Sequence, residues 1–279
     1  PPLFHDPAPT EIYTLGRSSA ASDVYKRQSL TRGMVGGHAS FTLSEETMER
    51  LGALVEEADA ALHIHVAEDP ADVEDCWHQY GVGLVERLDG HRLLRPSTLL
   101  AHGVHLEPAE LQEAQDRGAW LLHNPRSNMN NDVGYAPTHA FRRAALGTDG
   151  TDGDVLAEAR VAFLQLREAG RDDAFEAALR FLTGGHRLAT ELFGRPFGSL
   201  DAEAPADLIV LDYPSPTPIH DSNLAGHLLF GIDRGHVRSV MVEGHWVVRD
   251  GRVVTIDAEA ALARAGEAAP RLWSRMESL

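Results

Sequence analysis

Apolar positions recur in two alternating patterns from Ser29 onward, and these patterns predict strands followed by helices. The apolar runs of strand length are 34–37, 61–66, 97–102, 119–124 and 144–150. The segments with apolar residues at helical spacing are 43–60, which opens with Ser44 and acidic residues, 70–88 and 108–118. Alternating strands and helices predict a parallel sheet covered by helices, in a barrel or a doubly wound topology.

Polar side chains collect at the C-terminal ends of the predicted strands. They are His38, His65, Glu68, His102, His123, Asn124 and Asp149. A (β/α)8 barrel carries its chemistry at this end, because the strand ends and the following loops converge on one face. The pattern therefore favours an α/β fold of the TIM-barrel type over a doubly wound sheet.

The spacing of these residues predicts which strands are present. A full barrel takes about 250 residues, or roughly 30 per strand and helix. Asp149 follows His65 by 84 positions, and 64 residues precede His65. If His63 and His65 opened the first strand, only about three units would fit before Asp149. We therefore expect an incomplete barrel with strands four to eight, in which His65 ends the fifth strand and Asp149 follows the eighth.

The remaining segments predict a second, smaller region. Residues 152–170, 172–184 and 186–194 read as helices that close the barrel, and 206–213 reads as a buried strand. Residues 237–255 contain two turns between apolar runs, which is typical of β-hairpins. The last helix is expected to end at Pro270. The predicted domains are the barrel (29–198), a β-sandwich segment (199–256) and a C-terminal helix (257–279).

Residues 1–28 carry neither apolar pattern and have four prolines in their first nine positions. The stretch SAASDVYKRQ resembles a tail that recurs at the ends of proteins translated from fragmentary environmental sequence. We expect an unstructured, artefactual leader, with a flexible native linker as the alternative.

Composition and charge limit the classes of molecule that the protein is expected to bind. Acidic residues number 42 against 25 basic ones, and the net charge of −17 disfavours binding to nucleic acid or to an anionic membrane, which leaves a small-molecule substrate. The single Cys76 cannot form an internal disulfide, and no apolar run approaches the roughly 18 residues of a membrane helix. With no signal peptide recognised, we expect a cytoplasmic protein.

The strand-end residues suit a metal-dependent hydrolase. A divalent metal there requires neutral imidazole and carboxylate ligands and an open position for water, for which His65 and Asp149 are candidates. Glu68 could donate a proton to a leaving nitrogen while Asp149 takes one from the attacking water, and His102 could orient that water or the substrate. A lone strand-end histidine is more often a hydrogen-bonded core residue, and an aspartate between glycines is often a turn. Four such residues at consecutive strand ends favour the metal site.

Four motifs, in this order, resemble the amidohydrolase superfamily in its chlorohydrolase, cytosine deaminase and guanine deaminase-like branch. They are HIHVAE (63–68), LLAHGVHL (99–106), HNPRSNMNNDVGYAP (123–137) and LGTDG (146–150). Within that branch, SNMNNDVGYAP and HASFTLS (38–44) are most similar to the SsnA-like aminohydrolases. The resemblance extends from about residue 30 to the C-terminus.

The resemblance implies a mononuclear site for zinc, or alternatively iron, with His65 and Asp149 as ligands beside a first-strand His-x-His pair. It also implies that Glu68 shuttles protons, that His102 orients water or substrate, and that His38 touches substrate. His63 matches a structural position inside the strand.

The segment after the seventh strand is expected to be a loop that shapes the pocket. Asn124 and Asn128 are its candidate substrate-binding amides. Arg126 could meet an anionic substrate group, although a solvated loop arginine is the plainer interpretation. Four further histidines are interpreted as surface or hairpin residues, and they are His220, His227, His236 and His245.

One feature departs from the family pattern. The first-strand His-x-His has no counterpart before residue 29, where His5 stands alone. We therefore expect the chain as written to bind metal poorly and to have little activity.

The function predicted from the sequence is hydrolysis of a C–N bond other than a peptide bond, most simply removal of ammonia from an amine on a nitrogen heterocycle. The alternatives are hydrolysis of a cyclic amide or a chloro-substituted ring, or a non-catalytic barrel fragment. A homodimer is common in families of this shape.

Overall fold

The computed structural model describes residues 30–278 and divides the chain into two compact units between Arg195 and Pro196. The predicted leader and His5 lie outside the described residues. The predicted domain boundary after residue 198 falls close to this division. Each unit is described by itself below.

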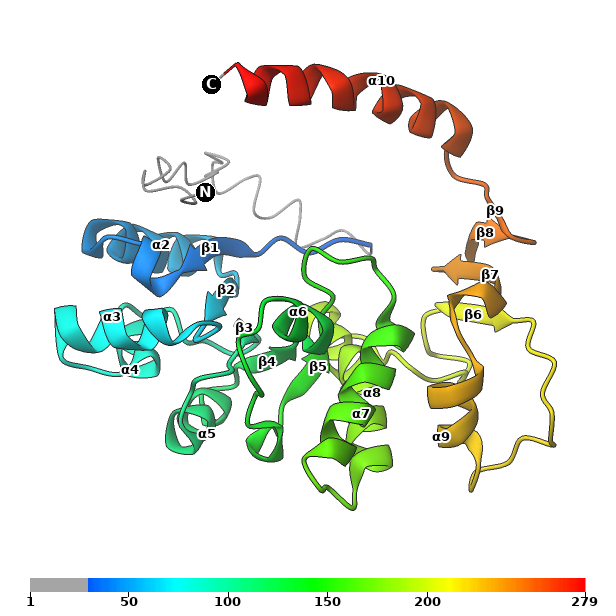
Figure 1. Ribbon diagram of the computed structural model, residues 1–279, viewed down its shortest axis with the longest axis horizontal. Coiled ribbons are helices and arrows are strands. Elements are labelled where there is room, and N and C mark those ends of the chain that lie inside the picture. The colour runs from blue at the N-terminus through cyan, green and yellow to red at the C-terminus, as the bar shows by residue number, and fades with distance from the viewer. Residues whose placement is uncertain (1–29, 279) are drawn as a thin grey trace. The chain divides into compact units, whose positions relative to one another are not determined.

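The first unit is built on a five-stranded parallel sheet (Figure 1). Its strands are β1 (Val35–Ala39), β2 (Leu62–Val66), β3 (Leu99–His102), β4 (Trp120–His123) and β5 (Ala144–Leu146). Their order in the sheet equals their order in the chain, and every neighbouring pair is parallel. This arrangement confirms the predicted α/β architecture and corresponds to part of a (β/α)8 barrel.

Helices follow the strands as predicted from the apolar spacing. They are α2 (Glu45–Ala58), α3 (Pro70–Tyr80), α4 (Leu84–Gly90), α5 (Pro108–Asp116), α6 (Pro125–Asn130), α7 (Val155–Glu168) and α8 (Ala174–Phe193). Two 3₁₀ turns, η1 (Ser40–Thr42) and η2 (Thr138–Ala140), lie in the connections. Ser44 caps α2 as expected, because its hydroxyl accepts from the Thr47 backbone N–H at 3.2 Å.

The apolar core follows the strand alternation. In β2 the side chains of Leu62, Ile64 and Val66 are fully buried, whereas His63 is exposed and His65 is half-buried on the opposite face. Strand β2 is thereby packed on one face and carries its two histidines on the other.

Two helix predictions in the first unit were wrong. One predicted helix is divided into two, and two predicted helices form one. Residues 70–88 form two helices, because Gly81 takes a left-handed backbone (φ 69°) and ends α3. Residues 172–184 and 186–194 form one helix, α8. Its central Gly184 does not break it: a Cβ there would lie 1.9 Å from the Ala144 carbonyl oxygen, so glycine permits close packing of α8 on β5.

The segment after β4 was also predicted incorrectly. It is the short helix α6 rather than a loop, with Pro125 at its first helical position. Proline suits that position because its missing N–H would have no partner within the helix and its φ is already helical.

The second unit contains a four-stranded antiparallel sheet, β6 (Leu208–Leu211), β7 (Val237–Val242), β8 (His245–Arg249) and β9 (Arg252–Val253), in that order. The two predicted hairpins are confirmed, since both connections have left-handed backbones, at Glu243 and Gly244 and at Asp250 and Gly251. The prediction of a buried 206–213 strand was wrong: Ile209 is 51% exposed, because β6 is an edge strand with a neighbour on one side.

The rest of the second unit is helical. It comprises α9 (Leu224–Gly226), the π-helical turn η3 (His227–Gly231), the 3₁₀ turn η4 (Arg234–His236) and α10 (Ala258–Glu277). Contrary to prediction, α10 continues past Pro270, which removes one backbone donor without ending the helix. Within residues 30–278, no helix is both long and apolar enough to cross a membrane.

Candidate active site

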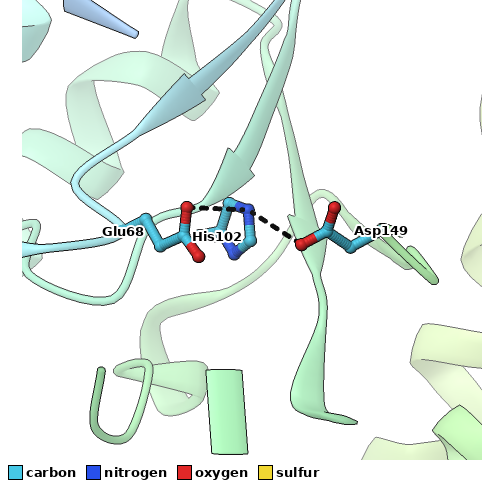
Figure 2. A group of neighbouring side chains, drawn as sticks. All are labelled: Glu68, His102 and Asp149. Atoms are coloured by element: carbon cyan, nitrogen blue, oxygen red, sulfur yellow. Dashed lines mark ion pairs between the residues drawn. The ribbon is translucent and has the colours of Figure 1, made fainter. Parts of the chain in front are cut away.

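Three predicted residues from separate strand ends meet at one point, as Figure 2 shows, and we call Glu68, His102 and Asp149 the site cluster. One ligand atom from each lies within 4.8 Å of the others. The His102 ring lies between the two carboxylates, with its Nε2 3.5 Å from Glu68 Oε2 and 3.9 Å from Asp149 Oδ2. The sequence prediction placed these residues at the C-terminal ends of the strands that are β2, β3 and β5, and the parallel sheet brings these ends together.

The backbone at the site is unusual for residues other than glycine. Ala67, His102 and Asp149 have positive φ angles of 49°, 71° and 50°. A left-handed conformation costs a residue with a Cβ about 1–2 kcal/mol, so surrounding contacts must hold it. One such contact is the buried Asp72 carboxylate, which accepts from the Ala67 N–H at 2.8 Å. The left-handed positions bring each side chain out of the strand direction and toward the cluster.

His102 is the buried centre of the cluster. Its side chain has no exposed surface, and its Nδ1–H donates to Asn128 Oδ1 at 2.8 Å. That bond leaves Nε2 unprotonated in the neutral ring, facing both carboxylates. This nitrogen is buried and has no hydrogen-bond partner. A buried polar atom without a partner is costly, and this one also faces two carboxylates, an arrangement in which a bound metal or substrate would satisfy it.

Asp149 is held as a carboxylate. Ser127 Oγ donates to its Oδ2 at 2.5 Å, and this bond is the main cause that lowers the pKa of Asp149. The Gly150 N–H, at 2.6 Å from Oδ1, and the nearby His102 and His65 lower the pKa further, against the opposing effect of burial. An ionised Asp149 is available as a metal ligand or as a proton acceptor.

Glu68 is partly exposed, unlike the buried His102. Its side chain is 28% exposed, and its Oε1 accepts from Asn131 Nδ2 at 3.1 Å. A partly exposed carboxylate beside a buried histidine can exchange protons with solvent and with a bound substrate.

His65 and His38 lie beside the cluster. The His65 ring stacks on His102 at a centroid distance of 5.4 Å, but His65 is not part of the site cluster itself. Its Nδ1–H donates to the His38 carbonyl oxygen at 2.7 Å, which leaves Nε2 free as an electron-pair donor. The exposed His38 ring lies 5.4 Å from the His65 ring, and its Nδ1 is 3.0 Å from Thr42 Oγ1.

The donor set fits a divalent metal. It combines the unpartnered Nε2 of His102, the free Nε2 of His65 and the carboxylates of Asp149 and Glu68. Imidazole nitrogen and carboxylate oxygen are the ligands that zinc and similar ions take in hydrolases.

The three predicted substrate-binding residues of the 124–128 segment are all engaged with protein groups. Asn128 contacts His102, as described above. The buried Asn124 packs its Oδ1 against Gly147, where a Cβ would lie only 2.0 Å away. Arg126 is not a solvated loop arginine: its Nε donates to the fully buried Glu158 at 2.7 Å, and its Nη1 pairs with Asp152 at 2.6 Å.

Other predicted histidines are not members of the site cluster. His63 is exposed on β2, and His123 is buried between Phe141 and Phe181. His227 is a correction: it is 9% exposed, outside the hairpins, and bonds the Tyr213 hydroxyl at 3.0 Å. It is buried because η3 turns its ring into the second unit, against Tyr213.

Sequence reasoning missed Ser127 and Asn131, which contact Asp149 and Glu68. The available signal was their spacing, because residues four apart share one face of a helix. That signal was not used because the segment was read as a loop.

Comparison with known proteins identifies the family. The family model described as the amidohydrolase family matches residues 15–247. The chain belongs to the amidohydrolase family. A relative from Desulforudis audaxviator, a 5-methylthioadenosine/S-adenosylhomocysteine deaminase, is 33% identical over 252 residues, covering 86% of this chain and 58% of the relative. A 5′-deoxyadenosine deaminase of Methanopyrus kandleri is 31% identical, covering 90% of this amidohydrolase chain and 61% of its own length.

Solved structures agree with this family. A zinc-bound adenosine deaminase from Xanthomonas campestris superposes with a TM-score of 0.82 at 26% identity, covering 92% of this chain and 61% of that one. An atrazine chlorohydrolase from Arthrobacter aurescens, also complexed with zinc, gives a TM-score of 0.71 at 25% identity, with 85% and 55% covered. The amidohydrolase chain thus spans somewhat less than two thirds of the proteins it matches. The likeness to SsnA-like aminohydrolases stays a prediction.

Proposed function

We propose that the protein is a zinc-dependent aminohydrolase that removes ammonia from an amino-substituted nitrogen heterocycle, with 5′-modified adenine nucleosides as its first substrate class. The observation that carries the proposal is the buried, unpartnered Nε2 of His102 between two carboxylates from other strands. The names of the relatives supply the substrate class.

The residues divide the chemistry between them. His65 and Asp149 would hold the metal, which supplies the Lewis acidity that makes a water molecule nucleophilic at neutral pH. The ionised Asp149 receives the proton of the attacking water. Glu68 delivers a proton to the ring nitrogen of the substrate, and its partial exposure lets it be reprotonated. His102 orients the attacking water or the substrate.

Four residues were predicted to contact substrate. His38 is exposed beside His65 and is the candidate best placed to touch substrate. Asn124, Arg126 and Asn128 shape the site through their protein contacts. Iron in place of zinc, a homodimer and a cytoplasmic location stay predictions.

The test is ammonia release from 5′-methylthioadenosine, S-adenosylhomocysteine and adenosine, by this chain and by a version extended at its N-terminus to the length of its relatives. Zinc per chain is measured in parallel. We expect turnover in the extended version, strong loss in Glu68→Gln, and retention in Glu74→Gln, which changes a neighbouring helix residue outside the cluster. A zinc-loaded, folded extended version that releases no ammonia from any of the three would contradict the proposal.

A second candidate is hydrolytic dechlorination, because an atrazine chlorohydrolase shares the fold. Chloride release from atrazine in the same preparations distinguishes it from deamination.

A further inference from the structure

One short segment contacts every member of the site cluster. Ser127 and Asn128 belong to α6, and Asn131 is the residue that caps its C-terminus. Each bonds a different member of the cluster, at 2.5, 2.8 and 3.1 Å. The members of the site cluster come from three different strand ends. Residues 127–131 therefore support all three of them at once.

Helical geometry explains how so short a segment reaches three residues. Ser127 and Asn131 are four positions apart, and the Asn131 N–H donates to the Ser127 carbonyl at 2.9 Å. They therefore lie on one face, with Ser127 Oγ also 3.4 Å from Asn131 Nδ2. Asn128, one position further round the helix, is 1% exposed and points at the buried ring of His102.

The segment is fixed in place by a part-buried ion pair. Glu158 of α7 is fully buried, and it accepts from both the backbone N–H and the Nε of Arg126, at 3.1 and 2.7 Å. Because α7 follows the strand that leads to Asp149, α6 is tied to the same part of the unit. A support that is itself rigid can hold other side chains to within fractions of an ångström.

We propose that Ser127, Asn128 and Asn131 are positioning residues, which act together to hold the three side chains of the site cluster. The inference rests on the proposed function for its catalytic consequence but on geometry for the positioning itself. Ser127 fixes the carboxylate that would bind metal, Asn128 fixes the tautomer of His102, and Asn131 fixes the carboxylate that transfers the proton. Partners of this kind usually change metal affinity or activity by about 10- to 100-fold when they are removed.

The first test needs neither metal nor activity. Long-range ¹H–¹⁵N NMR of the His102 side chain in this chain reports which ring nitrogen carries the proton. We expect the Nδ1–H tautomer in the wild type and in Asn128→Asp, which keeps an acceptor, and a mixture of tautomers in Asn128→Leu. An unchanged tautomer in folded Asn128→Leu would overturn the role of Asn128.

The second test separates the other two residues. In the N-terminally extended version, Ser127→Ala should weaken zinc binding about 10- to 100-fold, and Ser127→Thr should restore it. Asn131→Ala should leave zinc affinity unchanged and lower kcat about tenfold or more with little change in KM. Met129→Ala is the matched control, since Met129 lies on the same helix but is 60% exposed and outside the cluster contacts.

The outcomes separate the two proposals. If wild-type protein binds zinc but deaminates nothing, the proposed function fails, while the tautomer and zinc measurements still decide the positioning role. If Ser127→Ala and Asn131→Ala match Met129→Ala in zinc affinity, kcat and thermal midpoint, the positioning role is overturned.

Discussion

The histidines at the ends of β3 and β4 differ sharply although their strands are neighbours. The register pairs Leu100 with Leu121 and Ala101 with Leu122, so regular alternation would put His102 and His123 on the same face. His102 instead has a left-handed backbone and lies between two carboxylates. His123 keeps to the strand and is buried against aromatic rings.

The contrast shows that burial alone does not identify a functional histidine. Both side chains are almost completely buried, and both carry nitrogens without hydrogen-bond partners. His102 has a hydrogen-bond partner in Asn128 and two carboxylates nearby, whereas burial, together with the effect of His102, lowers the pKa of His123 to about 4. The first environment suits chemistry, and the second keeps a neutral ring as part of the core.

The largest expected effect comes from removing His102. His102→Gln in the N-terminally extended version should lower kcat by about 100- to 10,000-fold, because proton transfer by Glu68 and Asp149 depends on the water or substrate that His102 orients. His123→Phe is the matched comparison and should keep activity within a few-fold. Ammonia release measures both, and equal losses in the two folded variants would remove the distinction between the histidines.

A free-energy change of comparable size is expected at the aromatic residues around His123, where it affects stability rather than activity. Phe181 is 1% exposed and packs edge-on to His123 with a centroid distance of 5.6 Å. Phe181→Ala should lower the free energy of unfolding by about 3–5 kcal/mol, because it leaves a cavity in the core. Urea denaturation measures the change, with the exposed Phe41→Ala as control. A loss no larger than in the control would show that this cluster is not core.

Protonation of His123 should make the free energy of unfolding depend on pH. Its pKa is about 4 in the folded chain and ordinary, near 6.5, when unfolded, so between these values the unfolded chain binds more protons. The contribution of His123 to the free energy of unfolding should therefore be complete above about pH 6.5. It should fall by up to about 2–3 kcal/mol as the pH drops toward 4.

His123→Phe should abolish that part of the pH dependence, whereas the exposed His139→Ala should keep it. Urea denaturation at pH 7 and at pH 4.5 provides the comparison. The same slope in wild type and His123→Phe would assign the effect to other groups.

The smallest effect is expected at the rim of the cavity that His123 lines together with Tyr135 and Glu168. Tyr135 is 54% exposed, and its hydroxyl donates to the Glu168 carboxylate. Tyr135→Phe should change the thermal midpoint only slightly, since one exposed hydrogen bond contributes about 1 kcal/mol or less. A large drop would mean that this rim, rather than the aromatic cluster, stabilises the surroundings of His123.

Sequence patterns predicted most of the first unit because its signals are local. Its strand positions and the Ser44 cap follow from apolar period and capping chemistry, as the hairpin turns of the second unit follow from glycine placement. Two of the helix errors arose at glycines, because a glycine can either end a helix or allow it to pack closely. Gly81 ends a helix, whereas Gly184 allows α8 to approach β5, and only the neighbouring carbonyl of Ala144 distinguishes them.

The grouping of the three cluster residues could be predicted from the sequence, but the side chains that contact them could not. Glu68, His102 and Asp149 stand at strand ends, and a parallel sheet must bring such ends together. The contacts of Ser127 and Asn131 depend on a helix that the sequence reading took for a loop. Arg126 was assigned to substrate or solvent because its partner, Glu158, is 32 positions away in the sequence.

By itself the sequence determined the order of strands and helices, the residues at the strand ends and the family, because these depend on short-range patterns and ordered motifs. Only the tertiary structure decided how the His102 ring is directed toward the carboxylates and which side chains hold the site cluster. The physical reason is that side-chain direction depends on a single left-handed backbone angle, and hydrogen-bond partners depend on contacts between distant segments. Neither leaves a periodic trace in the sequence.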